Sequence, residues 1–116
     1  MAHPATSQER FITGYRTRLK HGNEDAYRTL HSHVPSIVEQ KLRAAGVLRW
    51  SIWTDGDTVF HSIETRDEYS KTAAALDALG QVDPAWDYAI GALVDSGEGS
   101  AALLQHVWTM DEVGQR

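Results

Sequence analysis

The order in which two hydrophobic periodicities follow one another constrains the fold of this 116-residue chain more than any other feature. Alternation of apolar and polar side chains predicts strands, and apolar side chains repeated every three or four residues predict helices. We therefore expect, in chain order, a strand at 11–19, a helix at 24–45, strands at 47–54 and 58–64 around the turn Asp55-Gly56-Asp57, a helix at 65–79, a short helix from 84 and a last strand at 101–110.

This order is typical of the ferredoxin-like α+β fold, a β-α-β-β-α-β arrangement in which helices cover one face of a four-stranded antiparallel sheet. The length suits one domain, so we expect a disordered tail at 1–9 and a single domain at 10–116. Apolar side chains are left for the other face, which a second copy would cover in a dimeric α+β barrel. Depending on register, these include Phe11, Tyr15, Val107 or Trp108.

Local signals indicate where the helices begin and break. Pro35 lies inside the first helical pattern, and because proline lacks an N–H, we expect a kink or a break near His33. Asn23 is the expected N-cap of that helix. The second helix has a capping-box pattern at 65–68, and Asp83 followed by proline predicts the N-cap of the short helix.

Composition excludes several classes of protein. The chain has no cysteine, which rules out disulfides and thiolate chemistry, and it has no apolar run of the roughly 20 residues that a membrane span needs. A net charge of −5 disfavours a nucleic-acid partner. The first ten residues lack the apolar stretch of a secretory signal, so we expect a cytoplasmic protein. Four Trp, four Tyr and six His in so short a chain instead favour a small-molecule pocket.

Two side chains of the first helix are candidates for chemistry. Tyr27 and His31 are four residues apart and lie in the apolar sector of that helix, so they point toward the sheet. A histidine in such a sector is often only a hydrogen-bonded core residue. The proline break one turn later favours a functional site, because local irregularities collect there.

Tryptophans form the second candidate group. Trp50, Trp53 and Trp86 lie near turns marked by glycine or proline, and an indole offers a flat apolar platform that suits a sugar ring. The alternative is that one or more of them belong to the core. Two further histidines, His61 and His106, lie on predicted strands and could meet across the sheet or a dimer interface. His31 and His33 face apart on a helix, so we expect no metal site.

Three aromatic-rich stretches have the sequences Asp25-Ala-Tyr-Arg-Thr-Leu-His-Ser32, Leu42-Arg-Ala-Ala-Gly-Val-Leu-Arg-Trp-Ser-Ile-Trp53 and Trp86-Asp-Tyr88. With them the chain resembles the L-rhamnose mutarotase family over about residues 10–110. The resemblance implies a dimeric α+β barrel in which His31 is the proton donor and Tyr27 contacts the sugar. It also implies an aromatic sugar contact at Trp50, where the family usually has tyrosine. The family has a pair of adjacent tryptophans after its second helix, and these correspond to Ala85 and Trp86.

The chain departs from the family in two places. The family tends to follow its histidine with Asn-Pro, whereas this chain has Ser32-His33 and delays the proline to Pro35. One member of the tryptophan pair is Ala85. These departures reshape the pocket wall, so the reaction can be retained while the sugar differs.

The expected function is therefore an aldose mutarotase that acts on a deoxyhexose such as L-rhamnose or L-fucose. Ring opening needs one proton delivered to the ring oxygen while another leaves the anomeric hydroxyl, and an imidazole can do both without a cofactor. Two alternatives remain open. One is a cofactor-free monooxygenase-like dimeric barrel enzyme, and the other is a non-catalytic sugar-binding dimer.

Overall fold

The computed structural model describes residues 10–116, and the tail predicted at 1–9 lies outside the described residues. Its centre is an antiparallel four-stranded sheet with the spatial order β2-β3-β1-β4. The strands are β1 (Phe11–Arg18), β2 (Val47–Asp55), β3 (Thr58–Thr65) and β4 (Ala102–Leu103). This is the strand order of the split β-α-β arrangement, and it confirms the predicted α+β class.

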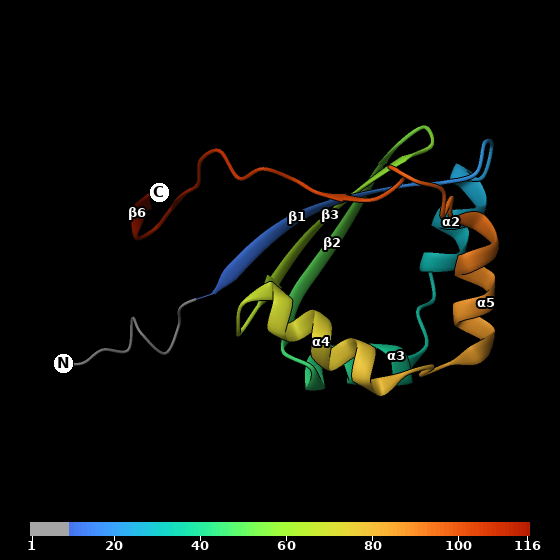
Figure 1. Cartoon of the computed structure of the whole chain (residues 1–116), viewed down its shortest axis with the longest axis horizontal. Helices are drawn as coiled ribbons and strands as arrows, with labels where there is room; N and C mark the ends of the chain where they lie inside the picture. The colour runs from blue at the N-terminus through green and yellow to red at the C-terminus, as the bar shows by residue number, and fades with distance from the viewer. Residues whose placement is uncertain (1–9) are drawn as a thin grey trace.

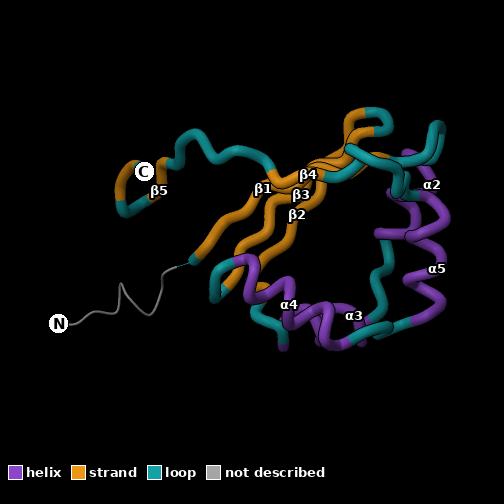
Figure 2. Tube along the Cα trace, viewed as in Figure 1, coloured by secondary structure: helices purple, strands orange, loops and turns teal. Residues whose placement is uncertain are grey.

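The helices lie on one side of this sheet, as Figure 1 shows. They are α2 (Glu24–His31), α3 (Ser36–Ala44), α4 (Tyr69–Leu79) and α5 (Pro84–Leu93). Two of them, α3 and α4, run beneath the sheet, while α2 and α5 stand side by side at one end (Figure 2). Within residues 10–116, no helix is both long and apolar enough to cross a membrane.

Pro35 breaks the first predicted helix into two. Helix α2 ends at His31, and the chain turns through residues 32–35 before α3 begins at Ser36. Pro35 itself is extended, with ψ of 139°, and takes the N-cap position of α3. Proline has no N–H to continue a helix and forces its predecessor away from helical angles. The prediction of a break near His33 is confirmed.

Of the three helix caps predicted from the sequence, only the one at Asp83 forms as expected. Asp83 caps α5 as expected, because its carboxylate accepts a hydrogen bond of 3.0 Å from the N–H of Trp86. The prediction of a capping box at 65–68 was wrong. Thr65 still belongs to β3, and its hydroxyl donates to the carbonyl of Asp67 at 2.6 Å. Asn23 occupies the N-cap position of α2, but its side chain donates to the carbonyl of Leu93 instead of capping the helix.

The long last strand predicted at 101–110 was also wrong. Of the predicted segment, only β4 pairs with β1, and the ladder between these two strands ends where Leu104 donates its N–H to the carbonyl of Gly14 at 2.8 Å. The chain then leaves the body of the molecule, and β5 (Met110–Asp111) pairs with β6 (Gly114–Gln115) in a small separate hairpin (Figure 2). A run of apolar residues can favour an extended backbone, but it does not supply the neighbouring strand that a ladder needs.

The register of β3 decides which side chains face the helices. Val59, His61, Ile63 and Thr65 are buried, so the odd-numbered positions of this strand face inward. Phe11 pairs with Thr65 and Tyr15 pairs with His61, so both lie on the helix-covered face and their proposed place on the open face was wrong. Val107 and Trp108 lie beyond β4 and are not part of the sheet. The open face instead carries four exposed apolar side chains, which are Ile12, Trp53, Phe60 and Leu104.

Candidate functional site

A cavity of about 470 Å³ lies between the inward face of the sheet and the helices. This volume suits a small molecule such as a monosaccharide. Two strands of the sheet, β2 and β3, and all four helices contribute side chains to its wall. Most of these are apolar or aromatic, and those with polar or charged groups are Tyr27, His31, Lys41, Trp50, His61, Trp86 and Asp87.

His31 has one ring nitrogen occupied and one left for chemistry. As the last residue of α2, it places Nδ1 2.8 Å from the carbonyl oxygen of Tyr27. A carbonyl can only accept, so Nδ1 carries a hydrogen and donates it, which leaves Nε2 without a hydrogen in the neutral ring. In the described part of the chain, Nε2 has no hydrogen-bond partner. Because the ring lines the cavity, this nitrogen is available to a ligand there.

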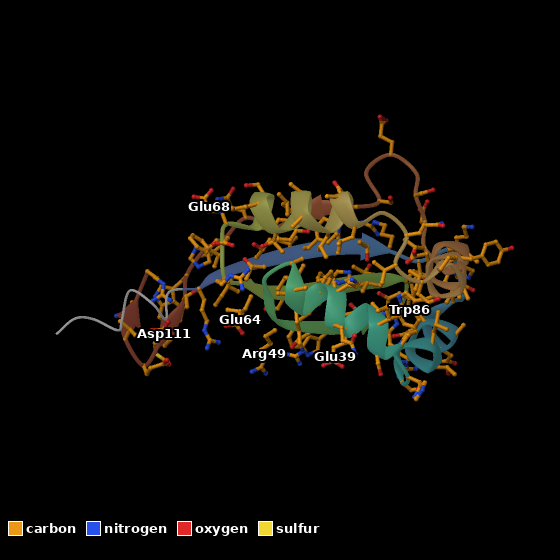
Figure 3. The ribbon with its side chains drawn as sticks, turned by 90° about the horizontal axis from the view of Figure 1, so that it is seen from below. Glu39, Arg49, Glu64, Glu68, Trp86 and Asp111 are labelled. Atoms are coloured by element: carbon orange, nitrogen blue, oxygen red, sulfur yellow. The ribbon has the colours of Figure 1, made fainter. Side chains whose placement is uncertain are left out.

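Two aromatic rings hold the His31 imidazole in place. The ring of Tyr27 lies 4.2 Å away between centroids, and the ring of Trp86 approaches edge-on at 5.2 Å. Trp86 is fixed in turn by Asp83, which caps the helix that carries it, and Figure 3 shows it at the end of the molecule formed by α2 and α5. The imidazole therefore has a defined orientation before any ligand binds.

Tyr27 lines the same cavity and is buried. Only 5% of its surface is exposed, and burial raises the pKa of its phenol. A phenol with a raised pKa stays protonated at neutral pH, so Tyr27 is a hydrogen-bond donor there and not a base.

Trp50 and His61 meet on the inward face of the sheet. The indole Nε1 of Trp50 donates to Nδ1 of His61 at 3.1 Å, and Nε2 of His61 lies 3.0 Å from the hydroxyl of Thr17. Burial and the nearby His31 lower the pKa of His61 from 6.5 to about 4. His61 is therefore neutral near pH 7, and both of its nitrogens are occupied.

The structure brings four of the predicted site residues together: Tyr27, His31, Trp50 and Trp86 all line the cavity. Trp53 lines an adjoining hollow at the edge of β2, together with Tyr27 and His31. Ala85 is exposed in the first turn of α5 and is not among the residues that line the cavity. Among residues 10–116, no cluster of three or more His, Asp or Glu side chains could hold a metal ion.

His61 was missed as a site residue. It was predicted to lie on a strand, where it could meet His106, but His106 is on the C-terminal segment and contacts Thr109 instead. A signal was present, because alternation within 58–64 places position 61 on the same face as Val59 and Ile63. Lys41 and Asp87 also line the cavity, and their spacing in the sequence gave no indication of it.

These features define a class of protein: a ferredoxin-like α+β domain whose helix-covered face encloses an aromatic cavity with one available imidazole nitrogen. Comparison with known proteins narrows the class. The model of the family described as L-rhamnose mutarotase matches residues 13–113, and the chain belongs to this family.

Two solved structures are similar to this chain. The L-rhamnose mutarotase of Formosa agariphila shares 18% identity, with a TM-score of 0.65, over 87% of this chain and 99% of that one. A dimeric ferredoxin-like protein from an uncultured marine organism shares 16% identity, with a TM-score of 0.54, over 85% of this chain and 87% of that one. At these identities the two structures support the fold. No curated protein sequence matches the chain significantly.

Proposed function

We propose that this protein is an aldose mutarotase that interconverts the α and β anomers of a deoxyhexose such as L-rhamnose or L-fucose, with His31 as its acid and base. The observation that carries the proposal is the position of His31: one nitrogen is fixed on the carbonyl of Tyr27, and the other is available in a cavity of monosaccharide size. Membership of the L-rhamnose mutarotase family supports the reaction type.

The reaction needs no group beyond those that line the cavity. Nε2 of the neutral imidazole takes the proton of the anomeric hydroxyl, the C1–O5 bond breaks, and its electron pair moves to O5. The imidazolium returns the proton to O5, which leaves an open-chain aldehyde and a neutral ring. After rotation about the C1–C2 bond, O5 attacks the other face of the aldehyde and the proton transfers run in reverse.

The other side chains bind and orient the sugar. The protonated phenol of Tyr27 donates a hydrogen bond to a sugar oxygen, and the indoles of Trp50 and Trp86 flank the ring. Trp53 faces the open side of the sheet but also borders the adjoining hollow at the edge of β2, so it lies at the rim of the binding surface. His61 cannot substitute for His31, because both of its nitrogens are paired.

Anomeric exchange measured by two-dimensional NMR on a small panel of deoxyhexoses tests the proposal. We expect the wild-type protein to accelerate exchange, and His31→Ala to reduce the acceleration by about 10²–10⁴-fold. His33→Ala is the matched control, because His33 is exposed and does not line the cavity. Equal exchange in wild type and His31→Ala would refute the assignment of His31.

Two other measurements distinguish the alternative functions. A tryptophan fluorescence response to sugar without accelerated anomeric exchange would indicate a non-catalytic binding protein. Oxygen consumption with quinol-like substrates would indicate the monooxygenase alternative.

We also propose that the protein is a homodimer in which a second copy covers the open face of the sheet. The four exposed apolar side chains of that face, Ile12, Trp53, Phe60 and Leu104, have no cover within the described residues. The C-terminal segment supports this, because Val107, Trp108 and Met110 are also exposed where the chain projects past the sheet (Figure 1). Exposed apolar surface of this extent is typical of an interface.

Sedimentation equilibrium at micromolar concentration tests the dimer. We expect the wild type to sediment as a dimer and Phe60→Glu to sediment as a monomer, because the substitution places a charge in the middle of the interface. Tyr88→Glu is the control, since Tyr88 is 81% exposed on α5, away from the open face. A monomeric wild type would contradict the proposal.

A further inference from the structure

Three side chains from three adjacent strands form a hydrogen-bonded row on the inward face of the sheet. Trp50 comes from β2, His61 from β3 and Thr17 from β1. The donor–acceptor distances are 3.1 Å between Trp50 and His61 and 3.0 Å between His61 and Thr17. Two members of the row, Trp50 and His61, also line the cavity, so the row joins the sheet to the ligand site.

The chemistry of the groups fixes the direction of both bonds. An indole N–H can only donate, so Nδ1 of His61 must accept and carries no hydrogen. A neutral imidazole has one hydrogen, which is then on Nε2 and is donated to the hydroxyl of Thr17. His61 is only 8% exposed, and its burial opposes the charged form that would break this pattern.

The row has a consequence for the cavity wall. An indole has a single hydrogen-bond donor, and the donor of Trp50 is already used within the sheet. The part of Trp50 that remains for a ligand is its apolar ring, so the wall at this position can pack against C–H groups but cannot satisfy a hydroxyl. A hydroxyl placed there would lose water without gaining a partner, which disfavours its binding.

We propose that His61 is a specificity-determining positioning residue: by holding the N–H of Trp50 within the sheet, it gives the cavity a wall that accepts a deoxy position of the sugar and rejects a hydroxyl there. The part of this proposal that concerns sugars rests on the proposed mutarotase function. The part that concerns the Trp50–His61 hydrogen bond does not, and it can be measured separately.

The hydrogen bond is tested on the wild-type protein by ¹H–¹⁵N NMR of the indole N–H groups, with Trp50→Phe used only to assign the Trp50 signal. We expect this N–H to exchange slowly with solvent and to keep its exchange rate when L-rhamnose is added, because its acceptor is His61. An N–H that exchanges quickly in the free protein and becomes protected only with sugar would overturn the proposal.

Two substitutions at position 61 test the two ring nitrogens of the imidazole separately. His61→Gln places a polar atom near the position of Nε2, toward Thr17, but removes the acceptor for Trp50. His61→Asn places its amide oxygen near the position of Nδ1 and retains that acceptor. The pair has similar size and polarity, so a difference between them reports on the Trp50 hydrogen bond and not on a general loss of packing.

The specificity is measured as the ratio of kcat/KM for L-rhamnose and L-mannose, which differ only by the hydroxyl at C6. We expect the wild type to favour L-rhamnose, His61→Gln to lower the ratio about tenfold, and His61→Asn to remain within about twofold of the wild type. An unchanged ratio of kcat/KM in a His61→Gln protein whose Trp50 N–H is released would refute the proposal.

The outcome also separates this proposal from the proposed function. If the wild type accelerates neither sugar, the proposed function fails, and the ratio of the dissociation constants of the two sugars is measured instead. Equal binding of the two sugars, or no binding of either, would overturn the specificity proposal.

Discussion

The buried imidazole of His61 predicts a specific loss of stability in mild acid. Its pKa is about 4 in the folded protein, against 6.5 for an exposed histidine, chiefly because burial disfavours the charged ring. Between these two pH values the unfolded chain binds a proton that the folded protein does not. The free energy of unfolding therefore falls as the pH falls, with a slope that approaches 1.36 kcal/mol per pH unit for one proton.

The size of the effect follows from the two pKa values. At about pH 7 His61 is neutral in both states and contributes little, whereas at about pH 4.5 the shift corresponds to a destabilisation of about 2.5 kcal/mol. Solvent in the adjoining cavity screens part of this, so we expect a loss of about 2 kcal/mol. The two depressed carboxyl groups, Asp57 and Asp111, lose their contribution only below the ordinary carboxyl pKa, so they fall outside this window.

Urea unfolding of wild type and His61→Asn between about pH 7 and pH 4.5 measures this contribution, because the difference between the two proteins cancels the other titrating groups. We expect the wild type to lose about 2 kcal/mol more than the variant over this range. The C2 proton of His61, followed by NMR, should titrate well below pH 6. The reasoning is refuted if both proteins lose the same stability, or if this proton titrates with an ordinary histidine pKa.

Three further predictions concern the elements that position the site. Asp83→Ala removes the acceptor for the N–H of Trp86 and should cost about 1 kcal/mol in urea unfolding, while Asp83→Asn should retain most of the cap. Gly46→Ala should destabilise the protein by about 1–3 kcal/mol, because Gly46 has φ of 110°, whereas Gly91→Ala within α5, where an added Cβ meets nothing within 4 Å, should stabilise it by up to about 1 kcal/mol. A Gly46→Ala protein as stable as the wild type would contradict the assigned strain.

Much of the site follows from local rules in the sequence. Tyr27 and His31 share a helix face because they are four residues apart, and the break after His31 follows from the missing N–H of Pro35. Asp83 and Pro84 together predicted the start of the helix that carries Trp86. Each of these signals acts between residues close in sequence, so each could be read before the fold was known.

Other predictions failed where the answer depended on a distant segment. The hydroxyl of Thr65 suits a capping box, but pairing with β1 extends β3 through this residue, and the helix begins only at Tyr69. The segment predicted as a strand at 101–110 is rich in apolar side chains, yet only its first part finds a neighbour in β1. A pattern can favour an extended backbone without supplying the hydrogen-bonding partner that makes it a strand.

The sequence by itself determined the order of the elements, the break at Pro35 and the shared face of Tyr27 and His31, because backbone geometry couples residues only a few positions apart. Only the tertiary structure decided that Trp50 donates to His61, that His61 is held neutral, and that the fourth strand of the sheet, β4, ends at Leu103. These features depend on the register between strands that are separate in sequence, and a shift by one residue would have turned the same side chains to the opposite face of the sheet.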